Sequence, residues 1–221
     1  MKNKTQPPEN GIYVYCVIRT PGETKNFGNI GFGGKEVYTI DYKEFSSVAS
    51  VAPLKKYDME NEKEIETHQN VVKMVMMEHS VIPVAYGMVF KSRKLVLASM
   101  KVAQKAMKKT LNVVEGKVEL GIKILNQQGQ ASQLDTGSCV EEFEKELGKL
   151  SSDSKKLTLF SKRLLMNTAY LVEKDRVDAF SDAVEALETK YKPLNIQYSG
   201  PWPAYNFVDI KILSKQQEGG R

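Results

Sequence analysis

His68 and His79 are the side chains of the chain best suited to acid–base chemistry near neutral pH. Both lie on the apolar stripe of one predicted helix, where eleven residues correspond to about 16 Å along the axis. They therefore cannot share a metal ion or a proton, and they build no Ser-His-Asp or Cys-His arrangement. We expect both histidines to be packed or half-buried, with a lone acid–base or partner contact as the alternative.

The glycine-rich stretch GNIGFGGK, residues 28–35, raises the question of a phosphate site. A phosphate-binding loop needs a glycine, four residues and then Gly-Lys-Ser/Thr at the start of a helix. Here Asn29 stands at the first glycine position, Glu36 replaces the hydroxyl residue, and a strand-like segment follows. The stretch therefore predicts an interstrand loop.

Acidic runs at 58–66 and 141–146 are typical of solvated surfaces, so we expect no catalytic residue, metal site, cofactor or small-molecule substrate.

A basic stripe is the clearest charge pattern. No Asp or Glu occurs between Glu78 and Glu115, and within this interval Lys101, Lys105 and Lys108 recur at helical spacing opposite an apolar stripe. Such a stripe indicates either a solvated helix face or a surface for an acidic partner. Nucleic acid is the weaker alternative, because arginine is scarce and no aromatic residue is interleaved for base stacking.

The one tryptophan of the chain lies in YSGPWPAYNFV, residues 198–208, with Trp202 between Pro201 and Pro203. Each proline fixes its own φ and drives the residue before it toward an extended conformation. The segment is therefore stiff and cannot be helical. It predicts either a corner that caps a core or a rigid aromatic knob, with Trp202 and Tyr205 as residue types enriched at binding hot spots.

The elements that position these residues fall into two groups. Residues 1–125 predict an α+β domain in which one sheet has two helices to cover a face. Period-two and β-branched segments indicate strands, and apolar spacings of three and four indicate helices. The predicted order is strand, strand, strand, helix, strand, helix, strand, at 11–18, 36–40, 45–53, 60–80, 82–90, 92–113 and 117–125.

Residues 126–137 are polar and without periodicity, which predicts a linker. Residues 138–221 predict a smaller α+β domain with a helical arm that extends to about Phe160. A strand at 163–172 follows, then a helix capped by Asp175 that ends before Pro193. Extended segments at 194–200 and 204–213 complete this domain.

The composition is that of a folded protein in a reducing compartment. The chain has 221 residues, 41% of them hydrophobic, and a formal net charge of +5. Cys16 and Cys139 are far apart and have no second cysteine or histidine at ligand spacing, which argues against a disulfide framework. The longest apolar stretch, 81–90, is about half of the roughly 20 residues that a membrane span needs, and the polar amino end is not a signal sequence. We therefore expect a cytoplasmic protein without a membrane segment.

Several segments together resemble one family. YSGPWPAYNFV is similar to the carboxyl-terminal Gly-Pro-Trp-Pro-Pro-Tyr-x-Phe signature of the gas vesicle accessory proteins of the GvpF/GvpL family. Residues 68–90 resemble the family's helix followed by Pro-x-x-Phe-Gly-Thr-x-Phe, and residues 117–125 and 167–174 resemble two of its strands. The blocks occur in the family's order over nearly the whole chain. Departures include Ala85 in place of an arginine and Ala204 in place of the second proline.

The resemblance implies two α+β domains, the first a modified ferredoxin-like fold. It also implies a non-enzymatic role in assembling gas vesicles through the hydrophobic shell protein (GvpA/GvpB type) and other accessory proteins, in the cytoplasm and associated with the vesicles. A minor structural component of the vesicle wall is the alternative, and a basic nucleic-acid-binding module a weaker one. The expected partner-binding residues are Pro201, Trp202, Pro203, Tyr205, Phe207, Tyr86, Met88, Phe90, Lys101, Lys105 and Lys108.

Overall fold

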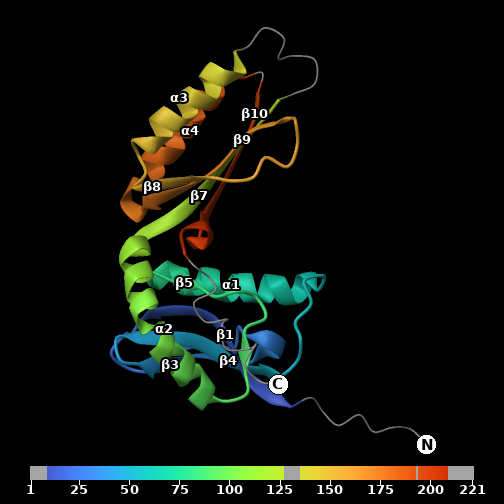
Figure 1. Cartoon of the computed structure of the whole chain (residues 1–221), viewed down its shortest axis with the longest axis vertical. Helices are drawn as coiled ribbons and strands as arrows, with labels where there is room; N and C mark the ends of the chain where they lie inside the picture. The colour runs from blue at the N-terminus through green and yellow to red at the C-terminus, as the bar shows by residue number, and fades with distance from the viewer. Residues whose placement is uncertain (1–8, 127–134, 193, 209–221) are drawn as a thin grey trace, which may run out of the picture. The chain divides into compact units, whose positions relative to one another are not determined.

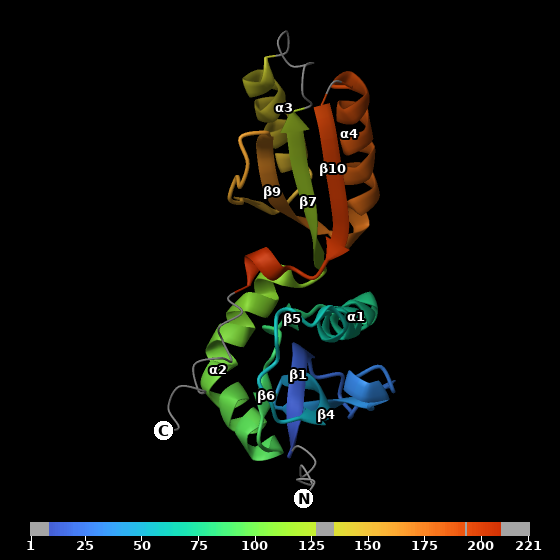
Figure 2. The same cartoon turned by 90° about the vertical axis from the view of Figure 1, so that its right-hand side faces the viewer.

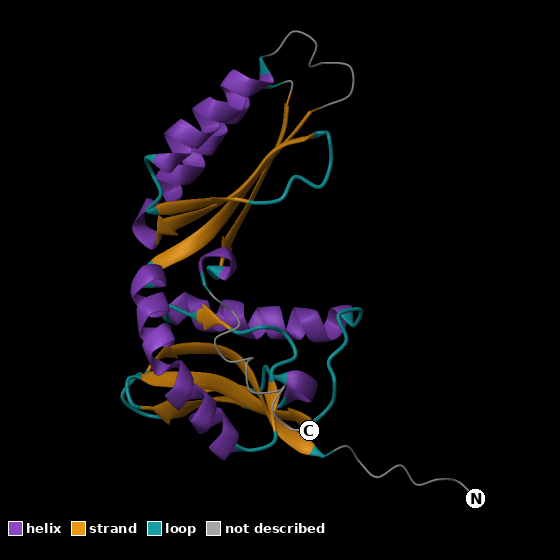
Figure 3. Cartoon of the chain, in the orientation of Figure 1, coloured by secondary structure: helices purple, strands orange, loops and turns teal. Residues whose placement is uncertain are grey.

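The computed structural model describes residues 9–126, 135–192 and 194–208, and these form two compact units (Figure 1). Within the described residues, the first unit consists of residues 9–115 together with Val208, and the second unit is Gly116–Phe207. Mixed α and β elements occur in both, as the α+β prediction requires (Figure 3). Each unit is described by itself.

The first unit contains an antiparallel sheet in the order β2-β3-β4-β1-β5, with β6 also paired to β1. The hairpin predicted at 36–53 is present, with Tyr42 opposite Phe45 across a two-residue turn. The single strand predicted at 82–90 is wrong. Two short strands occupy its ends, because Gly87 takes a left-handed φ of 88° and breaks the extended run. The strands are β1 (Asn10–Arg19), β2 (Asn26–Gly28), β3 (Val37–Tyr42), β4 (Phe45–Pro53), β5 (Ile82–Pro83) and β6 (Val89–Phe90).

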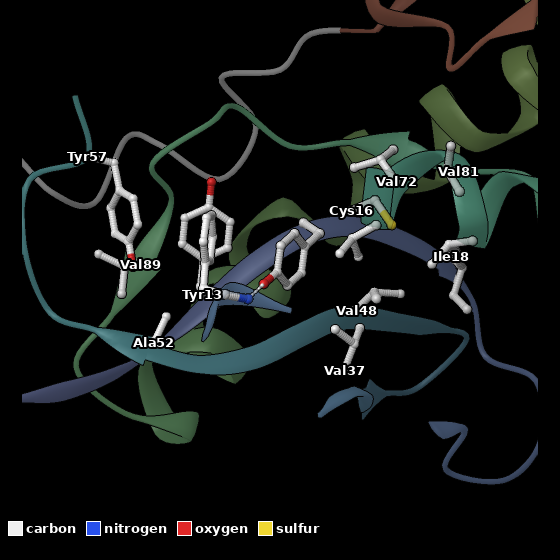
Figure 4. Close-up of a cluster of buried hydrophobic side chains, with 14 residues drawn as sticks. Tyr13, Cys16, Ile18, Val37, Val48, Ala52, Tyr57, Val72, Val81 and Val89 are labelled. Carbon is white, nitrogen blue, oxygen red and sulfur yellow. Dashed lines mark hydrogen bonds between the residues drawn. The ribbon is translucent and has the colours of Figure 1, made fainter. Parts of the chain in front are cut away.

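Helices α1 (Glu62–Glu78) and α2 (Arg93–Val114) lie where the apolar periodicity predicts them. Asn61 caps α1 by accepting from the Glu64 amide, and Ser92 caps α2 by accepting from the Leu95 amide. A cluster of buried side chains joins α1 to β1 and β4, as the close-up of Tyr13, Val48 and Val72 shows (Figure 4). Most positions on both faces of β1 and β4 are buried, so the sheet is covered on both faces and not on one.

The glycine-rich stretch connects β2 and β3, as predicted for an interstrand loop. It contains one short 3-10 turn, η1 (Phe32–Gly34), in which Gly33 has a left-handed φ of 62°. Phe32 is buried and its ring packs against the ring of Tyr13, with ring centroids 4.6 Å apart. The loop therefore supplies a side chain to the core of the first unit.

The second unit contains an antiparallel sheet in the order β10-β7-β9-β8. Strand β7 (Lys117–Asn126) pairs along its length with both β9 (Leu164–Glu173) and β10 (Leu194–Trp202), so it belongs to this sheet and not to the first domain as predicted. The boundary therefore lies between Glu115 and Gly116 and not at residue 125. Of the predicted linker, residues 127–134 lie outside the described residues, and Thr136 already begins a helix.

Helices α3 (Thr136–Gly148) and α4 (Val177–Lys190) lie behind one face of this sheet when it is viewed face-on (Figure 2). The helical arm ends at Gly148 and not near Phe160, since the edge strand β8 (Asp153–Lys156) follows. The predicted Asp175 cap is also wrong. Asp175 lies in a 3-10 turn, η3 (Lys174–Arg176), and the N-cap residue of α4 is Arg176, without a side-chain cap bond.

The opposite face of the second sheet, here called the helix-free face, carries Glu119, Gly121 and Lys123 of β7 and their β10 partners. After β10, a 3-10 turn, η4 (Tyr205–Phe207), replaces the extended segment predicted from residue 204. Residues 209–213 of that prediction lie outside the described residues.

Candidate partner-binding surfaces

Helix α2 presents the predicted basic stripe to solvent. Lys101, Lys105 and Lys108 are exposed, whereas Met100 and Met107 on the opposite side are fully buried. The 22 residues of α2 include no Asp or Glu. Hydrogen bonds from its own backbone and from the Gln104 side chain lower the pKa of the Glu44 carboxyl, and the nearby charge of Lys108 lowers it further. The stripe is therefore a positively charged surface carried on a regular, capped helix.

An exposed apolar line runs beside these lysines. Val102 is 74% exposed and Leu95 is 43% exposed, and their separation of seven positions in the sequence corresponds to about two helical turns. Ala106 continues the line about one turn later and is also exposed. Sequence periodicity missed this line because it assigned the outer side of α2 to lysines alone. The outer surface of α2 thus combines apolar side chains with cations, the composition of a contact surface for an amphipathic partner.

Tyr86, Met88 and Phe90 lie in the segment at the edge of the first sheet, beside β1. The Val84 amide donates to the Tyr15 carbonyl at 3.1 Å, and the Val14 amide donates to the Met88 carbonyl at 2.9 Å. The side chains of Met88 and Phe90 are buried, because they fill the core beneath this edge. Neither can contact a partner in this conformation. Tyr86 is half-buried, and its hydroxyl donates to the Asp58 carbonyl at 3.3 Å.

A buried polar network beneath this edge accounts for the burial of His68 of α1. The Gly87 amide donates to Tyr13 Oη at 2.7 Å, and Tyr13 Oη lies 3.0 Å from His68 Nδ1. The Tyr13 hydroxyl accepts from Gly87 and can therefore donate its proton to Nδ1, and the His68 side chain also hydrogen-bonds to the Val84 backbone. Burial lowers the pKa of His68 to about 4 and raises the pKa of Tyr13. His68 is thus a neutral core histidine that orders the segment between β5 and β6.

The Gly-Pro-Trp-Pro segment folds back onto the helix-free face. Trp202 is opposite Glu119 in the β10–β7 pair, after a register shift that follows Ser199. Glu119 Oε2 accepts from the Asn206 amide at 2.8 Å, and Oε1 accepts from Asn206 Nδ2 at 2.6 Å. Glu119 is 6% exposed, and its pKa is raised because burial outweighs the hydrogen bonds from Asn206. The segment is therefore held to the sheet at a buried carboxylate.

The side chains of this segment divide by burial. Pro203, Ala204 and Phe207 are buried, Trp202 and Tyr205 are half-buried, and Pro201 is exposed. Lys155 of the edge strand β8 donates to the Asn206 carbonyl at 2.7 Å and lies 5.5 Å from the Phe207 ring centroid. Phe207 therefore packs as part of a structural corner, and Pro201, Trp202 and Tyr205 are its solvent-reaching members.

Residues 9–126, 135–192 and 194–208 hold no group of three His, Cys, Asp or Glu side chains arranged to bind a metal ion. Cys16 and Cys139 are both buried free thiols, and burial raises the pKa of each. A surface pocket beside α1 includes Lys63 and Glu64 in its lining, and Glu64 is ion-paired with Lys55 at 2.6 Å. No helix in the described ranges is long and apolar enough to cross a membrane.

A match to a family model over nearly the whole chain decides the family. The model of the gas vesicle synthesis protein GvpL/GvpF family matches residues 11–136 and 126–209, which include residues of both units. The chain belongs to the GvpL/GvpF family. Gas vesicle proteins F1 and F2 of Halobacterium salinarum are 40% identical over 214 residues and 35% identical over 220 residues. The first match covers 95% of this chain and 98% of the relative.

The fold of this GvpL/GvpF chain also matches solved structures. The crystal structure of the gas vesicle protein GvpF from Anabaena sp. PCC7120 superimposes with a TM-score of 0.80 at 20% sequence identity, covering 90% of this chain and 95% of that chain. The crystal structure of GvpF from Microcystis aeruginosa gives a TM-score of 0.77 at 18% identity. These comparisons confirm the predicted family and the α+β fold class. Membership of the GvpL/GvpF family implies a role in gas vesicle formation.

Besides the exposed apolar line of α2, two further features of this GvpL/GvpF chain are not evident from the sequence. Glu119 resembled any half-buried strand residue, because its partner Asn206 is distant in sequence. Leu159 and Phe160 were assigned to a helix, yet both are exposed in the connection between β8 and β9.

Proposed function

We propose that this protein is a non-enzymatic accessory protein that binds the hydrophobic shell protein and other gas vesicle proteins, and so nucleates or chaperones shell formation in the cytoplasm. The observation that carries the proposal is the outer surface of α2. An exposed apolar line with Leu95 and Val102 runs beside Lys101, Lys105 and Lys108 there, with no acidic residue on the helix.

Physical chemistry links this surface to assembly. An apolar shell subunit aggregates unless its surface is covered until it reaches a growing shell. The exposed apolar line on α2 can make an apolar contact of limited area, which suits a transient complex. The lysines speed the encounter with acidic groups of a partner and reject basic ones. A reversible contact of this kind retains a subunit without trapping it.

The corner at Trp202 is a second contact in this proposal. The hydrogen bonds from Asn206 to Glu119 fix the corner, so that Trp202 and Tyr205 keep a constant orientation at the surface of the second unit. Rigid aromatic side chains lose little conformational entropy on binding, which is why they are frequent among binding hot spots. Phe207 supports this contact from below because it is buried.

The test is binding of purified shell protein to wild type and to Lys101→Glu/Lys105→Glu/Lys108→Glu. The control Lys56→Glu/Lys162→Glu/Lys192→Glu makes the same change of net charge at exposed residues that do not belong to α2. We expect the α2 variant to bind at least about tenfold more weakly at low salt, with the control close to wild type. Equal loss in both variants contradicts a role for α2, and binding of duplex DNA that weakens steeply with salt would favour the nucleic-acid alternative.

A further inference from the structure

Three of the four sheet edges in the described residues are protected against pairing with another strand. Strand β2 has three residues and a register shift, and β5 and β6 have two residues each. Strand β8 has four residues that include two lysines, and its Asp153 side chain accepts from the Ser154 amide at 2.8 Å. Short length, irregular register and charge are the usual means of preventing edge-to-edge association.

Strand β10 at the remaining edge lacks this protection. Leu194–Ser199 pairs in unbroken register with β7, from Leu194 opposite Asn126 to Ser199 opposite Gly121. The register shift comes only after Ser199, and none of these six residues is charged or a proline. A regular, uncharged edge of this length is a template for one more strand.

The register shows which backbone groups of β10 point outward. The Lys174 amide donates to the Gly116 carbonyl at 2.9 Å, so even-numbered β7 residues bond toward β9 and odd-numbered ones toward β10. Asn195, Gln197 and Ser199, which lie opposite odd-numbered β7 residues, therefore use their backbone groups within the sheet. The amides and carbonyls of Ile196 and Tyr198 point away from β7, along the outer edge.

The side chains at this edge define the chemistry of a partner strand. On the helix side, Tyr198 is 38% exposed; its ring centroid is 6.1 Å from that of Phe180, and its hydroxyl lies 2.9 Å from Ser181 Oγ. This ring offers a packing surface for an apolar or β-branched side chain of a neighbouring strand. On the helix-free side, Asn195, Gln197 and Ser199 are exposed and favour polar neighbours. The edge fits an uncharged segment that alternates apolar and polar residues.

We infer that the β10 edge accepts an extended segment of the shell protein as a fifth strand of the second sheet. This inference rests on the proposed function, because it names the part of the chain that holds the shell protein. Backbone hydrogen bonds to Ile196 and Tyr198 provide affinity. Packing against the Tyr198 ring favours a partner strand with apolar residues at the facing positions. The α2 surface and the Trp202 corner lie outside Leu194–Ser199, the corner following the register shift after Ser199, and neither is needed for the pairing itself.

The experiment measures amide hydrogen exchange in the full chain, alone and saturated with purified shell protein. We expect exchange at Ile196 and Tyr198 to slow at least about tenfold in the complex, because both amides gain a partner. The variant Gln197→Lys places a charge on the edge while its side chain stays in solvent, and we expect roughly tenfold weaker binding of the shell protein. Gln69→Lys on the exposed side of α1 makes the same substitution away from the edge and serves as the control.

The possible outcomes distinguish the strand addition at β10 from the proposed function. Shell protein that binds wild type without slowing these amides, and binds Gln197→Lys equally well, overturns the strand addition and leaves the proposed function intact. No binding to wild type overturns both. Protection that appears in the protein alone and rises with its concentration assigns the edge to a second copy of this chain, which also overturns the inference.

Discussion

Glu119 and Asn206 are joined by two hydrogen bonds, of 2.8 Å and 2.6 Å, between a buried carboxylate in β7 and the backbone and side chain of a residue beyond β10. The pair holds the Gly-Pro-Trp-Pro corner against the helix-free face. Because the carboxylate is buried, loss of a donor leaves it poorly compensated.

Asn206→Ala is therefore expected to destabilise the second unit by about 1–3 kcal/mol. Trp202 is the one tryptophan of the chain, so urea unfolding followed by its fluorescence reports on this corner. Asn195→Ala removes an exposed amide from the same sheet and is expected to cost less than about 0.5 kcal/mol. Equal free energies of unfolding for the two variants would show that the Glu119–Asn206 pair is not a stabilising contact.

Acid is expected to destabilise the first unit through His68. Its pKa is lowered from 6.5 to about 4 by burial, so between these values the unfolded chain binds the proton that the folded chain excludes. The free energy of unfolding must then fall as the pH drops below about 6.5, by about 2 kcal/mol between pH 7 and pH 5.

The variant His68→Gln removes this titration while keeping an amide that can hydrogen-bond, so its pH dependence should be shallower by that amount. Urea unfolding followed by circular dichroism at pH 7 and pH 5 measures the difference. His79→Gln makes the same substitution at the C-cap residue of α1, outside the Tyr13–His68 network, and serves as the matched control. Parallel pH profiles for wild type and His68→Gln would falsify the assignment.

Tyr13→Phe is expected to cost about 1–3 kcal/mol of stability, because it leaves the half-buried Gly87 amide without its acceptor and the buried His68 Nδ1 without its hydrogen-bond partner. The same loss should speed amide exchange between β5 and β6. Tyr38→Phe in β3 is the matched substitution on a half-buried ring. If exchange at Gly87 is as slow in Tyr13→Phe as in wild type, the hydroxyl does not order this segment.

The methionines of the two helices in the first unit should differ in how much they contribute to the stability of the folded protein. Met100 and Met107 are fully buried in α2, whereas Met74 and Met77 are 52% and 75% exposed on α1. Met107→Ala is expected to destabilise by about 2–5 kcal/mol because it opens a cavity. Met77→Ala is expected to stay within about 0.5 kcal/mol of wild type in thermal unfolding. A shell-binding defect in Met77→Ala without loss of stability would add α1 to the contact surface.

Local patterns predicted the helices of the first unit well, and the reason is physical. The apolar stripe of α2, including Val96, Met100 and Met107, and its Ser92 cap are encoded within a few residues of each other, so periodicity alone places the helix. Local patterns failed at Gly87, which interrupts the strand predicted at 82–90, and at Asp175, which does not cap α4. The conformation of Gly87 is set by the network around Tyr13, and the beginning of α4 is set by the 3-10 turn before it.

Pairing between distant strands could not be predicted from one sequence. The alternation in β7 identified a strand but not its sheet, which depends on β9 and β10. The candidate site shows the same limit. The lysines of α2 were visible as a stripe, whereas the Glu119–Asn206 contact and the unprotected β10 edge exist only after residues far apart in sequence meet.

The two buried thiols give each unit its own chemical reporter. Cys16 lies in β1 of the first unit and Cys139 in α3 of the second, and neither has measurable exposure. A thiol reagent can reach either sulfur only when the surrounding structure opens, so the labelling rate at each cysteine measures how often that unit opens. A bound partner that slows labelling at one cysteine alone would therefore identify the unit it stabilises, without any substitution in the chain.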